Sequence, residues 1–120
     1  MSVPVSRLKM RFIHLVDPGF MTRVGVHYGL FMTTVSNSGT VEQYTFWVEK
    51  GMMTIQNFFG CFAMTELGHG SNIAGLETTA TFDIDSDEFI IHSPSTTATK
   101  WWIGGAAESA THAYKKLIIV

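Results

Sequence analysis

Two short stretches of the chain combine glycine with groups that can hold a flat ligand. In residues 64–72, small hydroxyl side chains and glycines follow directly after an apolar run. A strand end that leads into such a loop exposes backbone N–H groups, which suit a phosphate or the polar edge of a heterocycle. In residues 100–105, a tryptophan pair precedes two glycines, so a planar ligand could lie against backbone beside an aromatic wall. The two stretches predict a flat-cofactor site, with plain core packing as the alternative.

Other familiar chemical patterns are incomplete. The five histidines do not occur at metal-ligand spacing, and the single cysteine, Cys61, lies inside an apolar run typical of an inert core thiol. The aspartates of residues 83–87 begin like a calcium loop, but the positions that need glycine and glutamate hold Glu88 and Pro94. We therefore predict no metal ligand and interpret the acidic run as a solvated hairpin turn.

Helices are expected before the two stretches. Apolar residues recur at helical spacing over residues 22–36, which predicts an amphipathic helix. Thr40 with Gln43 three positions later forms a capping box, which predicts a second helix over residues 41–50. Residues 1–21 are only weakly patterned.

Strands are expected in the second half. Residues 60–65 form a short apolar run typical of a buried strand, and residues 78–92 read as a hairpin with a polar loop. Residues 100–103 and residues 116–120 are predicted as two further strands. Helices followed by strands indicate an α+β fold, with a boundary near Phe58.

Composition indicates a piece of something larger. The chain has 120 residues, enough for one ordinary domain, and 46% of them are apolar, which argues against disorder. Only 15% are charged, against about a quarter in typical soluble domains, so we expect other protein to cover much of this surface. A net charge of −2 excludes a general nucleic-acid binder, and no apolar run approaches the ~20 residues of a membrane span.

Residues 61–72 closely resemble the flavin loop of the acyl-CoA oxidases. Residues 75–81 and residues 100–105 also resemble that family. The combination of Gly-His-Gly-Ser with Lys-Trp-Trp-x-Gly-Gly is similar to the oxidases rather than to the related acyl-CoA dehydrogenases. The resemblance covers roughly residues 20–112, and it identifies the chain as an N-terminal portion of an acyl-CoA oxidase.

The resemblance implies both a fold and a reaction. Residues 1–57 would be the end of an N-terminal helical domain, and residues 58–120 part of a central antiparallel β-barrel-like domain. The family binds FAD and oxidises a fatty acyl-CoA to a trans-2-enoyl-CoA, while O2 is reduced to H2O2 in fatty acid β-oxidation. It further implies a homodimeric full-length protein in the peroxisome, with the remaining C-terminal domains as partners of this segment.

Site residues follow from the same resemblance. The flavin-contacting threonine and glycine of the family fall on Thr65 and Gly104. Ser71 matches a candidate contact to the acyl-CoA, and Trp102 could flank the flavin ring. No catalytic residue is expected here, because the family's base is a glutamate in the C-terminal helical domain and Glu66 belongs to the flavin loop. A base must reach the Cα proton, so the chain alone is expected to be inactive.

Some features leave alternatives open. The chain does not end in a peroxisomal tripeptide, which leaves the cytoplasm as the other expected location, and residues 113–117 carry two lysines where the family's next strand is more apolar. A shortened or misjoined gene product would explain both. The alternatives are a fragment of an acyl-CoA dehydrogenase and a non-catalytic module that binds acyl-CoA or a partner subunit.

Overall fold

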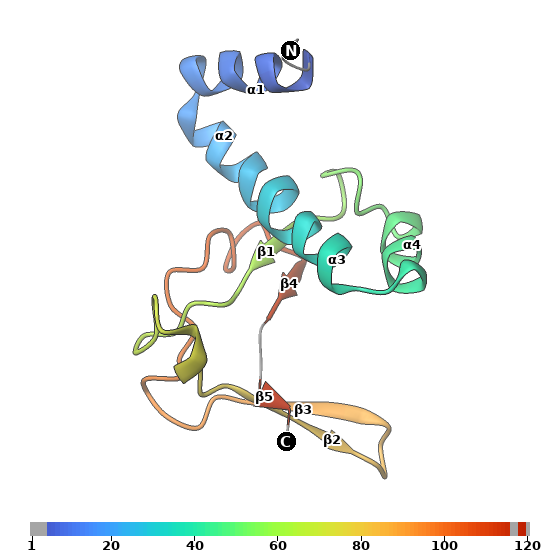
Figure 1. The fold of residues 1–120 in the computed structure, drawn as a ribbon, viewed down its shortest axis with the longest axis vertical. Helices are drawn as coiled ribbons and strands as arrows, with labels where there is room; N and C mark the ends of the chain where they lie inside the picture. Colours follow the sequence, from blue (N-terminus) through green and yellow to red (C-terminus); the bar gives the residue numbers. More distant parts are fainter. Residues whose placement is uncertain (1–4, 116–117, 120) are drawn as a thin grey trace.

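Helices form the first part of the computed structural model, which describes residues 5–115 and 118–119. The Asp17 carboxylate accepts a hydrogen bond from the Phe20 N–H at 2.8 Å and Pro18 follows it, so a helix begins here. This helix runs on through a π-helical segment, because Val26 and Thr33 at the junctions keep right-handed helical dihedrals. The helices are α1 (Val5–Val16), α2 (Pro18–Gly25), η1 (Val26–Met32), α3 (Thr33–Ser38) and α4 (Val41–Glu49) (Figure 1).

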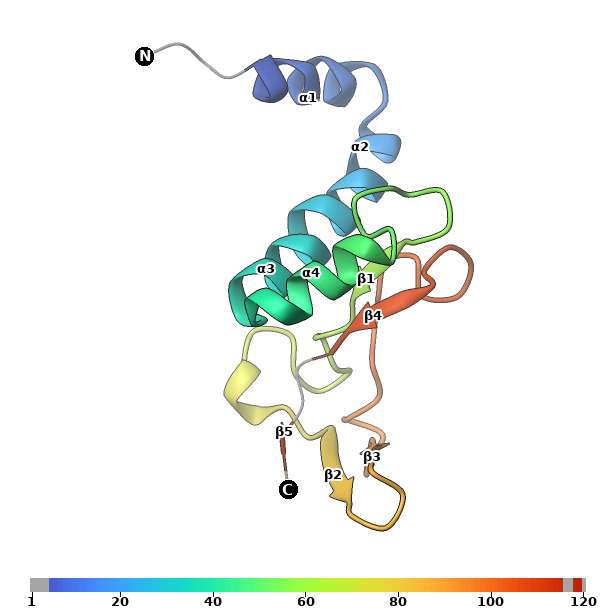
Figure 2. The same cartoon turned by 90° about the vertical axis from the view of Figure 1, so that its right-hand side faces the viewer.

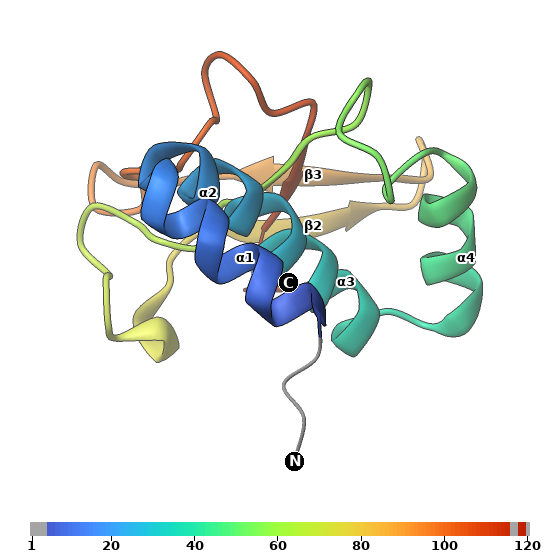
Figure 3. The ribbon, with the colours of Figure 1, turned by 90° about the horizontal axis from the view of Figure 1, so that it is seen from above.

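The predicted helices are confirmed, with one earlier start and one addition. The first begins at Pro18 rather than Thr22, and α4 carries both hydrogen bonds of the expected capping box between Thr40 and Gln43. Helix α1 lies in the weakly patterned segment and turns away from α2 (Figures 1 and 2). Seen from above, it lies over the long helix formed by α2, η1 and α3 (Figure 3).

Two small sheets follow the helices. The expected hairpin is confirmed, with β2 and β3 antiparallel, and β5 joins β2 in parallel. Strands β1 and β4 pair in parallel, with Gly60 opposite His112. The α+β order is confirmed, and no closed barrel occurs within residues 5–115 and 118–119. The strands are β1 (Gly60–Phe62), β2 (Thr79–Asp83), β3 (Glu88–His92), β4 (His112–Tyr114) and β5 (Ile118–Ile119), with a 3-10 turn η2 (Ile73–Gly75) before β2.

The predicted strand at residues 100–103 is wrong. Only Lys100 makes a strand-like bridge, to Glu66, and Trp102 has a φ of +56°, which ends the extended backbone. Turns follow, and the next strand is β4, which the sequence analysis does not predict. Of the predicted strand at residues 116–120, positions 118–119 form β5, while 116, 117 and 120 lie outside the described residues.

A fully buried histidine joins the helices to the first strand. The Gly60 N–H donates to Nδ1 of His27 at 2.9 Å, so Nε2 carries the proton and donates to the Met52 carbonyl, also at 2.9 Å. One side chain thus fixes η1, the turn that follows α4 and β1 relative to one another. Aromatic rings pack around it: Tyr28, Phe31, Phe58 and Phe59.

Replacing Gly60 by alanine is expected to destabilise the protein. A Cβ at this position would lie 2.1 Å from the ring of buried Phe31, so the core must shift at a cost of about 2 kcal/mol. A Cβ at Gly25 meets nothing within 4 Å. Gly25→Ala is expected to raise the free energy of unfolding by about 1 kcal/mol, because alanine favours the helix. Denaturant unfolding measures both, and equal effects of the same sign would contradict the packing described.

Candidate functional site

The two glycine-bearing stretches lie against each other. The Leu67 N–H donates to the Thr99 carbonyl at 2.8 Å, and the Gly68 N–H donates to the Thr97 carbonyl at 3.0 Å. The Trp101 N–H donates to the Thr65 carbonyl at 3.1 Å. Thr65 is therefore hydrogen-bonded to a residue three positions before Gly104, and the two stretches lie side by side.

Glu66 forms the centre of this contact. Its side chain is fully buried, and its Oε1 accepts hydrogen bonds from the Thr78 N–H at 3.0 Å, from the Thr78 hydroxyl at 2.5 Å and from Lys100 Nζ at 3.1 Å. Its Oε2 accepts from the Glu77 N–H at 2.9 Å and lies 3.1 Å from His69 Nδ1. Both oxygens are thus occupied, as a carboxylate removed from water requires.

These donors also decide the charge of Glu66. Burial by itself raises the pKa of the carboxyl, but the hydrogen bonds from Thr78, Glu77 and Lys100 outweigh it and lower the pKa to about 2. The group is ionised at neutral pH and turned inward. Glu66 therefore serves as a structural anion and is unsuited to act as a general base.

A second carboxylate extends the network to the loop before Lys100. The side chains of Ser95 and Thr97 donate to Glu77, and these hydrogen bonds lower the pKa of Glu77 below its usual value. His69 Nε2 lies 3.5 Å from the Glu77 carboxylate, so the imidazole stands between the two glutamates. The loop that follows Thr65 is in this way held to residues 95–100 along its length.

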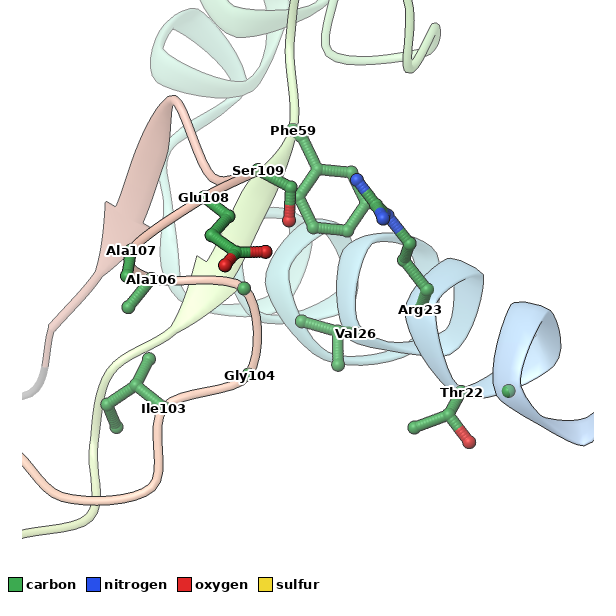
Figure 4. A pocket seen from close by; sticks show the side chains of 12 residues that line it. Thr22, Arg23, Val26, Phe59, Ile103, Gly104, Ala106, Ala107, Glu108 and Ser109 are labelled. Carbon is green, nitrogen blue, oxygen red and sulfur yellow. The ribbon is translucent and has the colours of Figure 1, made fainter.

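A pocket of about 430 Å³ opens beside Gly104 (Figure 4). The long helix contributes Arg23 and Val26 to one wall, and the turn of residues 103–109 forms the other. The Arg23 guanidinium lies over the Phe59 ring, 5.6 Å from its centroid, in the geometry of a cation–π contact. The pocket is thus lined by the Phe59 ring, by one cation at Arg23 and one anion at Glu108, and by backbone at the glycines.

The backbone at Gly104 is open to a ligand. A Cβ built there would meet only Val26, at an ordinary 3.5 Å, so the space beside this backbone is not filled by protein. Gly105 has a φ of +80°, a conformation that favours glycine. Trp102 keeps a φ of +56° although the residue is 90% exposed, and such strain in a bulky residue is characteristic of functional sites. The open backbone at Gly104 fits a flat ring, whereas Trp102 does not line the pocket.

The remaining predicted residues are placed apart from this pocket. Ser71 lies on the exposed loop before η2, and only Gly104 of the three predicted site residues lines the pocket. Cys61 is buried, and burial raises the pKa of its thiol, which agrees with an inert core residue. Within the described ranges, no cluster of three potential metal-ligating side chains occurs, and no helix is long and apolar enough to cross a membrane.

Sequence reasoning missed Arg23, Phe59 and the pairing of Glu66 with Lys100. Phe59 sits in a segment without clear periodicity, and Arg23 follows no motif. Glu66 and Lys100 are 34 positions apart, and only the folded backbone brings them together.

Several known proteins are similar to this chain in sequence and in structure. Acyl-coenzyme A oxidase 3 of Yarrowia lipolytica is 63% identical over 105 residues, which are 88% of this chain and 15% of that protein. Acyl-coenzyme A oxidase 2 of the same yeast is 55% identical across 97% of this chain and 17% of that protein. The crystal structure of the yeast's oxidase 3 matches 99% of this chain and 18% of its own chain, with 55% identity and a TM-score of 0.87.

The chain belongs to the acyl-CoA oxidase family. It corresponds to a segment of these oxidoreductases and spans less than a fifth of the length of the relatives described. No protein-family model matches it. A Caenorhabditis elegans acyl-CoA oxidase-2 structure bound with FAD, ascaroside-CoA and ATP matches 77% of this chain and 14% of its own, with 43% identity and a TM-score of 0.68. The predicted α+β fold, a segment of the acyl-CoA oxidase fold, is confirmed.

Acidification is expected to destabilise this oxidase segment through Glu66. Its pKa is about 2 when folded, against 4.5 for an ordinary glutamate, so the stabilisation is present above the unfolded pKa and is lost as the pH falls. The free energy of unfolding should drop by roughly 3 kcal/mol between about pH 5 and about pH 2.

Urea unfolding at several pH values measures this loss. Glu66→Gln is expected to flatten the pH dependence, whereas Glu88→Gln on the exposed strand β3 should leave it unchanged. Identical pH profiles for wild type and Glu66→Gln would contradict the role of the buried carboxylate.

Proposed function

We propose that the protein containing this chain uses FAD to oxidise the Cα–Cβ bond of fatty acyl-CoA, giving trans-2-enoyl-CoA while O2 becomes H2O2. The single observation that carries the proposal is the contact between the Thr65 loop and the stretch that leads to Gly104. The Trp101 N–H and the Lys100 ammonium make this contact through hydrogen bonds to the loop. Identities of 50% and above to named acyl-CoA oxidases support an oxidase rather than a dehydrogenase.

Each predicted site residue has a role in this proposal. The open backbone at Gly104 and the loop of Thr65 would hold the flavin ring, and Ser71 on its exposed loop would contact the acyl-CoA. When bound, FAD would accept the hydride that leaves Cβ. A C. elegans relative whose structure contains FAD supports this choice of cofactor.

Further parts of the protein would complete the site. Residues 1–57 would be part of an N-terminal helical domain and residues 58–120 part of a central β domain, with the base supplied by a glutamate elsewhere. The exposed apolar side chains of β3, which include Phe89, Ile90 and Ile91, support contact with additional protein. We propose a homodimer in the peroxisome, as expected for this family.

The reaction is tested on the complete gene product with palmitoyl-CoA. We expect stoichiometric H2O2 when O2 is the only acceptor. Reduction of an artificial dye without any peroxide would contradict the oxidase and indicate a dehydrogenase. A protein that purifies colourless and does not bind added FAD would contradict both.

Gly104→Ala separates flavin binding from folding. The added Cβ meets only Val26 at 3.5 Å, so we expect an unchanged melting temperature. The same methyl would occupy the space proposed for the flavin ring, and the Kd for FAD is expected to rise about tenfold, or about 1.4 kcal/mol. Gly29→Ala, whose Cβ also meets nothing within 4 Å, is the matched control on η1, outside the lining of the pocket. Equal Kd values for the two variants would argue against Gly104 as a flavin contact.

A further inference from the structure

Lys100 is bonded to residues on both sides of Thr65. Its ammonium donates to the Met64 carbonyl at 3.1 Å and to Glu66 Oε1 at 3.1 Å. The next residue, Trp101, donates its N–H to the Thr65 carbonyl. The successive residues 64–66 of the loop therefore each accept a hydrogen bond from Lys100 or Trp101.

We propose that the ion pair between Lys100 and Glu66 is a positioning device that sets Thr65 relative to Gly104, and so shapes the flavin site. This inference rests on the proposed function. Lys100 is a positioning residue, because the hydrogen bonds of its ammonium go to the loop on either side of Thr65. Lys100 influences the positions of both Thr65 and Gly104, because it contacts the loop on either side of Thr65 and lies four residues before Gly104.

The ion pair between Lys100 and Glu66 is largely shielded from water. The Lys100 side chain is 16% exposed and that of Glu66 is 0% exposed, so little water competes for either group. Buried ion pairs add little net stability compared with apolar packing, but a geometry with few alternatives can specify one arrangement. The ammonium also satisfies a backbone carbonyl, which a purely apolar side chain could not do.

Glu66 is held independently from the hairpin side. The N–H groups of Glu77 and Thr78, together with the Thr78 hydroxyl, still satisfy the carboxylate when Lys100 is removed. Loss of Lys100 should therefore leave the fold standing and remove only the hydrogen bonds of its ammonium to Met64 and Glu66. This makes a positioning role separable from a purely structural one.

The test uses the complete gene product with Lys100→Met and, as control, Lys50→Met at the end of α4, where the ammonium lies over the Phe46 ring. Three quantities are measured: the Kd for FAD by fluorescence quenching, the visible spectrum of the bound flavin and the far-UV circular dichroism of the flavin-free protein. For Lys100→Met we expect a Kd at least tenfold higher and a shifted spectrum, with far-UV circular dichroism unchanged. Lys50→Met should match wild type, and Lys100→Arg, which keeps charge and donors, should recover most of the affinity.

The outcomes separate the inference from the proposed function. If wild type binds FAD and Lys100→Met binds it with the same Kd and spectrum, the positioning role is overturned while the proposed function stands. If wild type binds no FAD, the proposed function fails, and the inference fails with it. Should Lys100→Met not fold, Thr78→Val replaces it, because it keeps the shape of the side chain and removes the hydroxyl that contacts Glu66, Ser93 and the Ala98 carbonyl. A severalfold rise in Kd for that variant supports the role, and an unchanged Kd overturns it.

Discussion

A carboxylate that leaves water must find donors for both oxygens, and this requirement organises the region around Glu66. The side chain reaches the hairpin through Thr78, its own loop through His69 and the tryptophan stretch through Lys100. The positions of Thr65 and Gly104 depend on it, because Thr65 directly precedes Glu66 and Gly104 lies four positions after Lys100.

A second buried polar group connects this region to the helices. His27 holds β1 through the Gly60 N–H, and β1 leads directly towards Thr65. The close approach of Phe31 to Gly60 brings the long helix against the strand, so that Arg23 and Val26 face the turn of residues 103–109. The pocket beside Gly104 thus depends on helix packing as well as on the loops.

The sequence predicts elements with local signals and misses those that depend on distant contacts. The capping box at Thr40 and the hairpin at residues 78–92 were both predictable, because a few neighbouring side chains determine each. Residues 100–103 look like a strand by composition, but Lys100 and Trp101 are engaged by the loop of Thr65, and Trp102 then takes a left-handed turn. Strand β4 has no local sequence pattern that identifies it as a strand. It forms because it pairs with β1, which lies about 50 positions earlier in the chain. The two candidate stretches were recognisable by residue type, whereas the ion pair that joins them was not.

A double-mutant cycle between Glu66 and Lys100 tests this account most directly. The free energies of unfolding of wild type, Glu66→Gln, Lys100→Met and the double variant give the energy with which the two side chains act together. For a buried pair that joins two segments, we predict a coupling of at least about 2 kcal/mol, above the ~1 kcal/mol limit of exposed pairs. Effects that add to within about 0.5 kcal/mol would mean that the two residues act independently, and the central role of this contact would be contradicted.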